Sequence, residues 1–479
     1  MELNPRNIKE HIGELGTKEA SSLLMEWILN SNEQKLREKA LEILGNLDKG
    51  NHYTFFEQLF LSDANIKICL ISGKILKDKY IEKTKLLSLT KYVLEKVELI
   101  EKKLLTLEIL KKINNRESWK LLKDYLQNSI KSIKTTELSE YPEKIFLKSH
   151  SPINEDLIVF CLNIILYDYF IKKCGFNVTL RGGKIILLNC EGSGFGSIDE
   201  IPVIERLTDL EHLILKRNKI TNIYGLNHLE NLQILDLSHN KLKTIDNLDK
   251  LQNLKELNLS HNQIKEIKNV NNLQSIQKVT LDHNQITEIS EISGLSNLED
   301  LNLNNNKITV IKGLIDLPKL EKLNLSFNDI KKISGLDRLR NLHWLHLNNN
   351  QIEKIEGLEN LNDLKGLYLS NNNIQKIENL DTLIELRKIE LSNNKIKEIE
   401  GLDTLHKLQE LFLDNNKIKE IRGIDALTQL IILFLKSNEI THFNNEKIEK
   451  LQNLNFIFLN DNPLTPESKI CYNRRSRYP

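Results

Sequence analysis

The sequence has few cysteines and almost no net charge. Its five cysteines are scattered, odd in number and without a CxxC pair, at positions Cys69, Cys161, Cys174, Cys190 and Cys471. Such usage is typical of reduced thiols in an intracellular compartment and argues against structural zinc. The 67 Lys and Arg residues against 66 Asp and Glu residues leave a net charge of +1, so no overall field attracts the chain to nucleic acid.

Long apolar runs are also lacking. The amino-terminal residues show no basic segment followed by an apolar core, which predicts no secretory signal. The most apolar window, residues 157–171, is shorter than the roughly 20 residues that a membrane span needs, and Asn163 and Asp168 interrupt it. We therefore predict a buried helix in this window and expect a soluble, cytoplasmic protein.

The sequence is rich in one repeated phrase. LDLSHNKL at positions 235–242 returns as LNLSHNQI at positions 257–264. The pattern L-x-x-L-x-L-x-x-N-x-I/L starts at Leu210, Leu232 and Leu254 and keeps this spacing as far as Leu430, after which a slightly longer interval reaches Leu454. A fixed period of about 22 residues with this phrase is the signature of leucine-rich repeats.

Each position of the phrase has a physical role. In L-x-L the alternate leucines, such as Leu235 and Leu237, point to one side of a short strand, while Asp236 points to the other. The return segment I-x-x-I-x-x-L-x-x-L has a three-residue period that favours tight turns over a long helix. The sequence therefore predicts an α/β solenoid: a leucine-rich repeat horseshoe with a parallel concave sheet, preceded by an all-α domain.

An asparagine holds the same place in every repeat. At the corner after each strand, its amide satisfies backbone groups that would otherwise be buried without partners. We interpret this ladder as structural. Its members are Asn218, Asn240, Asn262, Asn284, Asn306, Asn328, Asn350, Asn372, Asn394, Asn416, Asn438 and Asn462.

Residues about 198–470 resemble the 22-residue, SDS-like class of leucine-rich repeat proteins, through phrases such as LNLSFNDIKKISGLDRL and LSNNKIKEIEGLDTL. That class includes the regulator of type 1 protein phosphatase and the bacterial internalins, both of which bind proteins on the concave sheet. The resemblance implies a protein-binding concave face, and the intracellular branch is the closer comparison.

The rest of the chain suggests further segments. Residues 1–130 have an amphipathic helical pattern whose Ile-Leu pairs recur at nearly equal spacing, at positions 43, 75 and 109, which fits either a short HEAT-like α-solenoid or a plain helical bundle. We expect a linker and buried helix over 131–175, a cap hairpin with a degenerate repeat over 176–209, repeats over 210–453, and a cap with a basic tail over 454–479.

Nothing in the sequence predicts an enzyme. EGSGFGS (191–197) is glycine-rich, but no helix pattern follows it as a phosphate loop requires. His239, His261 and His283 recur in successive repeats. Strand spacing places the outer two of these histidines about 10 Å apart, too far for one zinc ion without convergence. We therefore predict no catalytic residue, no cofactor and no metal.

The outward strand positions change character along the array, from polar residues in the early repeats to aromatic ones later. We predict a protein-binding site there, formed by Phe327, Trp344, His346, Tyr368, Glu390, Phe412 and Phe434, because large exposed aromatics are typical interface anchors. The alternative for the last phenylalanines is packing beneath the carboxy-terminal cap.

These patterns favour a non-catalytic intracellular scaffold or regulator that binds a folded protein, with no small-molecule substrate and no membrane. One alternative, implied by the resemblance, is a regulatory subunit of an enzyme such as a serine/threonine phosphatase. A weaker alternative is nucleic-acid binding through the tail CYNRRSRYP, where Arg474, Arg475 and Arg477 cluster.

Overall fold

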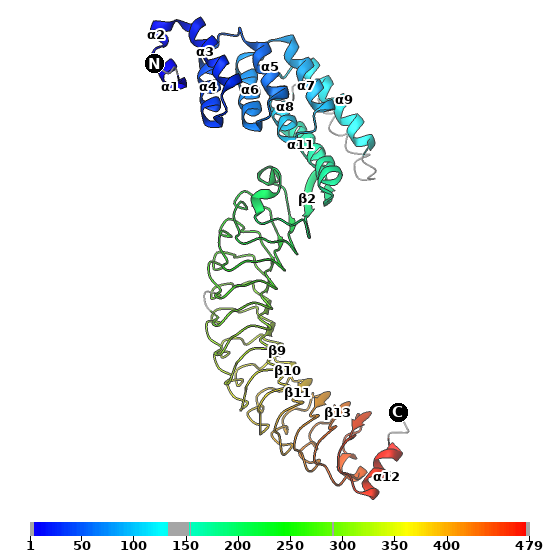
Figure 1. Cartoon of the computed structure of the whole chain (residues 1–479). Coiled ribbons are helices and arrows are strands. Elements are labelled where there is room, and N and C mark those ends of the chain that lie inside the picture. The colour runs from blue at the N-terminus through cyan, green and yellow to red at the C-terminus, as the bar shows by residue number, and fades with distance from the viewer. Residues whose placement is uncertain (1–3, 133–152, 154, 290–291, 476–479) are drawn as a thin grey trace. The chain divides into compact units, whose positions relative to one another are not determined.

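The computed structural model describes residues 4–132, 153, 155–289 and 292–475. It contains two compact units, residues 1–186 and 187–479, which are coloured blue to cyan-green and green to red in Figure 1. Most of the predicted linker, residues 133–152, and the end of the basic tail, residues 476–479, lie outside the described residues.

The described residues of the first unit are helical, with short connections, up to residue 174. Its helices are α1 (Pro5–Glu10), α2 (Ile12–Leu15), α3 (Thr17–Asn30), α4 (Gln34–Leu47), α5 (Tyr53–Ser62), α6 (Ile66–Lys79), α7 (Thr84–Lys96), α8 (Ile100–Ile113), α9 (Arg116–Ser132) and α11 (Glu155–Tyr169), which a π-helical turn (Phe170–Cys174) extends. Helix α3 packs on α4, α5 on α6 and α7 on α8, and α4, α6 and α8 pack successively on one another. The Ile-Leu pairs of the sequence pattern lie on these last three helices, where Leu44, Leu76 and Ile109 are fully buried.

A β-hairpin follows the helices. Strands β1 (Asn177–Arg181) and β2 (Lys184–Asn189) are joined by Gly182 and Gly183, which have φ of 60° and 75°, as a tight hairpin turn requires. A side chain at Gly183 would collide with the Phe160 ring of α11, because a Cβ there would lie 2.4 Å from it. The apolar helix α11 is therefore packed in the protein core, and no helix among the described residues has both the length and the apolarity to cross a membrane.

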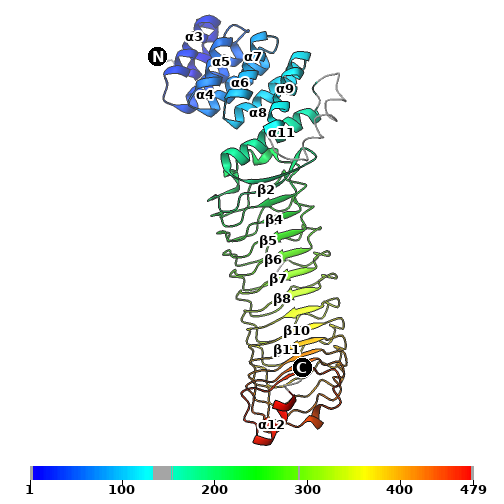
Figure 2. The same ribbon diagram turned by 90° about the vertical axis from the view of Figure 1, so that its right-hand side faces the viewer.

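The second unit is a curved ladder of short strands, which Figures 1 and 2 show from two sides. The strands are β3 (His212–Ile214), β4 (Ile234–Asp236), β5 (Glu256–Asn258), β6 (Lys278–Thr280), β7 (Asp300–Asn302), β8 (Lys322–Asn324), β9 (Trp344–His346), β10 (Gly366–Tyr368), β11 (Lys388–Glu390), β12 (Glu410–Phe412), β13 (Ile432–Phe434) and β14 (Phe456–Phe458). Each pairs in parallel with the next, one repeat later, so that Leu235 lies opposite Leu257. These twelve parallel strands, preceded by a helical region, confirm the predicted fold class.

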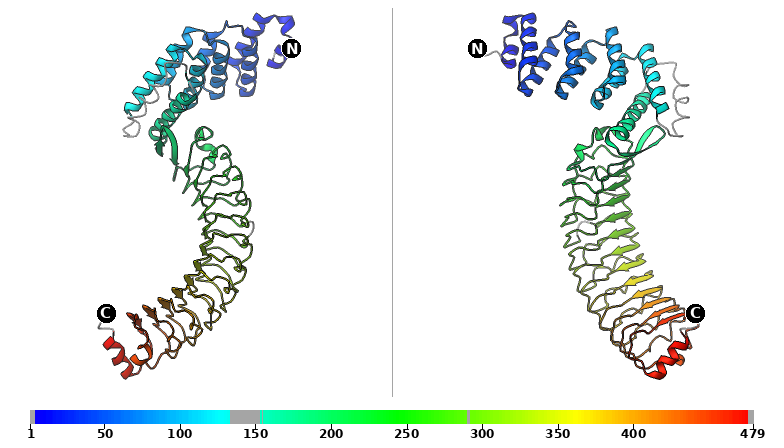
Figure 3. Two further views of the ribbon diagram at one scale, coloured as in Figure 1. Left: turned by 180° about the vertical axis from the view of Figure 1, so that it is seen from behind. Right: turned by 45° about the vertical axis from the view of Figure 1, so that its right-hand side comes forward.

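The strands line the concave side of the ladder, and loops form its convex side (Figures 1 and 3). The middle residue of every strand in the ladder is buried, whereas the first and third residues are partly accessible in most strands. The return loops contribute buried isoleucines and leucines such as Ile245, Leu248 and Leu251. The longer last interval contains a 3₁₀ turn, Asn445–Ile448, which takes up the additional chain length before β14.

The asparagine ladder forms the same hydrogen bonds in successive repeats. The Asn306 Nδ2 donates to the carbonyl oxygens of Leu281 and Leu303 at 3.0 and 3.1 Å, and its Oδ1 accepts from the Ile286 N–H at 3.0 Å. Asn306 is buried, as are the ladder residues from Asn218 to Asn438, whereas Asn462 in the last repeat is half-buried. Each amide thus ties one strand to the preceding repeat and to its own corner.

The residue before each ladder asparagine lies in the left-handed region. His239, His261 and His283 have φ of 54°, 53° and 55°, and Phe327 has φ of 54°. These residues follow the strands and do not belong to them. The prediction that Phe327 occupies an outward strand position is therefore wrong. Phe327 forms the corner that follows the extended segment.

Helix α12 (Pro466–Arg475) follows the last strand. Its Tyr472 ring packs edge-on against Phe443 at 6.3 Å, and the Tyr472 hydroxyl accepts a hydrogen bond from the Leu459 N–H at 3.2 Å. The Ser468 hydroxyl accepts from the Phe443 N–H at 2.9 Å. These contacts cover the end of the core, where the next repeat would otherwise stack.

Candidate protein-binding face of the repeat array

The concave positions of β9 to β14 carry a group of aromatic side chains that we call the aromatic surface. The first and third positions of β5 to β8 are instead polar, for example Glu256, Lys278 and Asp300. The aromatic surface comprises Trp344, His346, Tyr368, Phe412, Phe434 and Phe458 together with the charged residues Lys388, Glu390 and Glu410. The change from polar to aromatic side chains thus occurs between β8 and β9.

Trp344 lies over the neighbouring strand, because that strand carries a glycine. A Cβ at Gly366 would lie 2.4 Å from the Trp344 ring and 2.9 Å from the Tyr368 ring. Gly366 is itself buried although it occupies an outward position. The indole therefore covers the bare backbone of β10, and Tyr368 stacks on His346 with ring centres 4.1 Å apart. The rings of Trp344 and Tyr368 have centres 6.5 Å apart and are tilted by 40° relative to each other.

Replacing Gly366 by alanine is expected to lift the indole of Trp344 off β10. The backbone of Gly366 does not require glycine, since its φ is not positive, so the added methyl group acts mainly by collision with the ring. Tryptophan fluorescence would measure the change as a shift to longer wavelength. The same substitution in a Trp344→Phe background is the control, because the other two tryptophans lie in the helical unit; a shift that persists there would contradict the expectation.

Lys388 connects the two halves of the aromatic surface. Its Nζ lies 3.1 Å from Glu390 and 3.2 Å from Glu410, and it is placed over the rings of Tyr368 at 5.6 Å and Phe412 at 4.8 Å. Partial burial lowers the pKa of Lys388, but the two carboxylates raise it by more, so that its pKa lies above the ordinary value. The ammonium group therefore stays charged at neutral pH, with its position set by four neighbours.

The phenylalanines form a continuous stack. Phe412 and Phe434 have ring centres 4.8 Å apart, and Phe434 and Phe458 have ring centres 4.3 Å apart, with nearly parallel planes. These three rings are half-buried, whereas the neighbouring Phe456 is 45% exposed. Stacking between repeats thus removes part of the apolar area from water and leaves an even apolar floor.

His346 lies within this cluster as a partly buried imidazole. Burial lowers its pKa; Asp300 opposes this, and Lys322 and Lys388 add to it, so that the folded-state pKa lies below the ordinary value of 6.5. Since the unfolded chain then binds a proton more readily, the stability of the array should fall as the pH drops below about 6.5.

A His346→Gln substitution is expected to weaken that pH dependence. Comparing the free energy of unfolding of the two proteins at pH 7.5 and pH 5.5 would measure it, with the original protein losing more stability on acidification. Equal losses in both proteins would show that other groups cause the pH dependence. The comparison between variants is needed because other side chains titrate in the same range.

The structure brings six of the seven predicted binding residues onto adjacent strands, namely Trp344, His346, Tyr368, Glu390, Phe412 and Phe434. Phe327 is separate, since it lies at the corner after β8 and is 53% exposed. Sequence reasoning missed Lys388, Glu410 and Gly366. The sequence does indicate that Gly366 is unusual, because the first residue of the strand has a side chain in all the other repeats.

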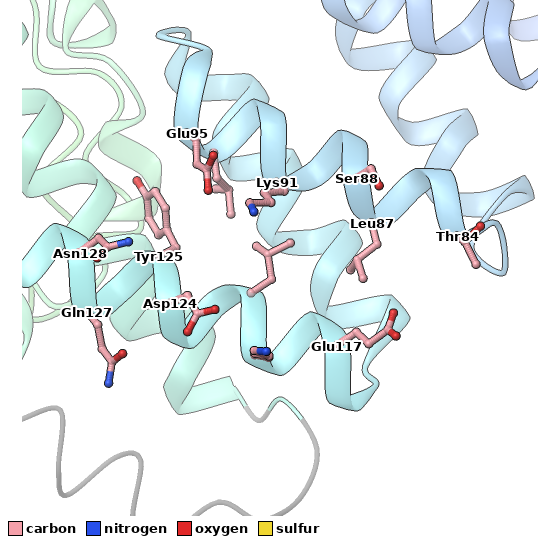
Figure 4. A pocket seen from close by; sticks show the side chains of 13 residues that line it. Thr84, Leu87, Ser88, Lys91, Glu95, Glu117, Asp124, Tyr125, Gln127 and Asn128 are labelled. Carbon is pink, nitrogen blue, oxygen red and sulfur yellow. The ribbon is translucent and has the colours of Figure 1, made fainter.

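The helical unit has a groove of its own, of about 840 Å³, between α7 and α9 (Figure 4). Apolar Leu87, Leu94 and Leu121 contribute to its lining. Charged and amide side chains from both helices, including Lys91, Glu95 and Asp124, also line it. The groove is therefore amphipathic, with both signs of charge present.

Twelve stacked parallel strands, a buried asparagine ladder and an open concave face define a solenoid, a class that typically acts as a non-catalytic interaction module. Family models match the same residues: one described as "Leucine rich repeat" matches residues 274–330, and one described as "Leucine Rich repeats (2 copies)" matches residues 198–250, 252–295, 340–382 and 384–426.

The chain is also similar to several solved structures. An internalin (inlF) from Listeria monocytogenes is 31% identical, with 60% of this chain and 86% of that chain covered and a TM-score of 0.54. The leucine-rich repeat domain of APL1 is 21% identical, with 61% and 78% covered and a TM-score of 0.53, a likeness of fold. A leucine-rich repeat protein of Leptospira interrogans is 27% identical, with 57% and 72% covered and a TM-score of 0.46. Comparison with curated proteins finds no match. The chain belongs to the leucine-rich repeat family.

Proposed function

We propose that the protein is a non-catalytic, intracellular scaffold or regulator that binds a folded protein partner on the aromatic surface. The observation that carries this proposal is the packed cluster of Trp344, Tyr368 and Lys388 on the concave sheet. Tryptophan and tyrosine are enriched among residues that dominate interface energies, above all near the centre of an interface. A cluster that is already packed also loses little side-chain freedom when a partner binds.

The dimensions favour a protein partner over a small molecule. Twelve strands at a spacing of about 4.8 Å give a sheet of roughly 50 Å along its ladder. An ordinary protein interface buries about 800 Å² on each partner, which a surface of this length accommodates. The rings of the aromatic surface form a floor and not an enclosed cavity, and so present a broad contact area.

The experiment that tests the proposal is capture of partners from native cell extract with the intact protein and with a Trp344→Ala/Tyr368→Ala variant. A Val310→Ala/Ile315→Ala variant is the matched control, because these side chains are 52% and 46% exposed in the loop between β7 and β8. A protein retained by the intact form and by the control, but lost from the aromatic variant, would support the proposal. Equal retention by all three forms would contradict it.

A narrower form of this proposed function is that of a regulatory subunit of an enzyme such as a serine/threonine phosphatase. It rests on the resemblance of the repeats to the SDS-like class and on the mixture of Trp344, Tyr368, Glu390 and Phe412 on one face, which is similar in kind to the face that the phosphatase regulator uses. Phosphatase activity that co-purifies with the intact protein but not with the aromatic variant would favour it. Retained partners without such activity would remove it.

The helical unit has a separate proposed role. We propose that it is a short HEAT-like array, supported by the paired packing of α3 to α8, and that it supplies a second contact or sets the orientation of the bound partner. The weaker alternative, nucleic-acid binding through the basic tail, falls on Arg474, Arg475 and Arg477, of which the first two side chains and the whole of the third lie outside the described residues.

A further inference from the structure

Two consecutive corners of the repeat array bring together two histidines and an aspartate. His261 follows β5, and Asp282 and His283 follow β6. The backbone at each corner is tied to the next repeat, since the His261 N–H donates to the Asp282 carbonyl oxygen at 2.9 Å and the His283 N–H donates to that of Asn304 at 3.0 Å. These backbone hydrogen bonds between neighbouring repeats thus fix the positions of the three residues relative to one another.

Their side chains face one another. The Asp282 Oδ2 lies 2.8 Å from the His283 Nδ1 and 4.0 Å from the His261 Nε2. The centres of the two imidazole rings are 4.1 Å apart, and the rings are nearly parallel. One ligand atom from each of the three residues lies within 4.8 Å of the others. In a tetrahedral site with bonds of about 2.1 Å, ligand atoms lie roughly 3.4 Å apart. The two imidazoles are stacked with planes 14° apart, so the partly exposed rings have to turn out of the stack until their in-plane nitrogen lone pairs point to one ion.

The surroundings suit a metal ligand set. The second oxygen of Asp282 lies 3.4 Å from the Asn302 Nδ2, which leaves Oδ2 directed at the imidazoles. Outer contacts of this kind orient ligating carboxylates. The side chains of His261 and His283 are 39% and 40% exposed, against 16% for Asp282, so an ion could reach them from solvent without opening the fold.

We propose that His261, Asp282 and His283 form a binding site for a divalent transition-metal ion of the zinc class. Two imidazoles and a carboxylate bind ions of this class more readily than they bind Mg²⁺ or Ca²⁺, which prefer oxygen ligands alone. The ion links the corners of two repeats and leaves a fourth position for water or for a ligand from a partner. Strand spacing opposes an ion shared by His239, His261 and His283. In the folded array the third ligand is instead Asp282, whose Oδ2 lies within 4.0 Å of a nitrogen of both His261 and His283.

Asparagine substitutions test the proposal without disturbing the corner. The equivalent position carries asparagine with the same left-handed backbone at Asn305, Asn349, Asn371, Asn393 and Asn415. His261→Asn and His283→Asn therefore remove an imidazole and keep a residue that the corner accommodates. His239→Asn is the matched control, since its ring stacks on His261 at 4.0 Å but lies outside the ligand group.

The experiment titrates the full chain and each variant with Zn²⁺ in competition with a chromophoric chelator, and with Co²⁺ to record the visible spectrum. We expect one equivalent of Zn²⁺ to bind, His261→Asn and His283→Asn to weaken it by about tenfold or more, and His239→Asn to change it by less than about threefold. A Co²⁺ spectrum without a sulfur charge-transfer band would show that no cysteine is a ligand. Equal affinity in all four proteins, or equal loss in all three variants, would overturn the proposal.

Discussion

A Trp344→Ala substitution is expected to weaken binding of the partner on the concave face by more than about 2 kcal/mol, roughly thirtyfold in affinity. The indole covers Gly366 and closes the cluster against Tyr368. Removing it deletes a large apolar contact and also exposes the backbone of β10. Both effects act at the β9 end of the aromatic surface, where the indole is packed on β10.

Titration calorimetry with the identified partner would measure this loss. The Val310→Ala/Ile315→Ala protein should bind normally, because it loses exposed apolar side chains in the loop between β7 and β8, away from the strands. Gly366→Ala is a second probe, since it keeps the indole but displaces it; an intermediate loss of affinity would show that the position of the ring matters as well as its presence. Unchanged affinity of Trp344→Ala for a partner that docks on the concave sheet would place the anchor elsewhere.

An Asn306→Ala substitution is expected to lower the free energy of unfolding of the repeat array by about 1 to 3 kcal/mol. The side chain serves three buried backbone groups, namely the carbonyl oxygens of Leu281 and Leu303 and the N–H of Ile286. Alanine leaves the buried Ile286 N–H without this hydrogen bond, whereas the carbonyl oxygens of Leu281 and Leu303 each lose one donor and keep a second, the Nδ2 of Asn284 and of Asn328. The loss is therefore a desolvation cost and not only a missing contact.

Asn304→Ala is the control for this prediction. Asn304 lies two positions earlier at the same corner and is partly accessible, and its substitution keeps the backbone carbonyl that the ladder uses. We expect it to change stability by less than about 0.5 kcal/mol. Denaturant unfolding followed by far-ultraviolet circular dichroism would measure both variants, and equal stability of the Asn306→Ala protein and the original would remove the structural role of the ladder.

Several features of the fold followed directly from the sequence because they are local and periodic. A strand of alternate leucines, a corner asparagine and a short apolar return recur in every repeat, and each of these needs only its own repeat and the one beside it. The positions of all twelve strands in the array could be predicted for this reason. The left-handed corner was harder to recognise, because histidine, phenylalanine and asparagine all occupy it, and so Phe327 was assigned to a strand.

The chemistry of the surfaces depended more on neighbours in space. Gly366 matters because an indole from β9 lies on it, and Lys388 matters because it is placed between two rings and two carboxylates from three strands. Asp282 has no special feature within its own repeat, but stacking of the repeats places it beside His261. None of these relations is visible in one repeat, since each depends on side-chain directions in two or more repeats.

The periodicity of the chain was sufficient to specify a leucine-rich repeat array with a parallel concave sheet, because stacking repeats in register buries every leucine of the phrase. Which outward side chains act together depended on the folded array. Stacking places equivalent positions of neighbouring repeats within about 5 Å of one another. This spacing turns scattered aromatics into one aromatic surface, and two histidines and an aspartate into one ligand group.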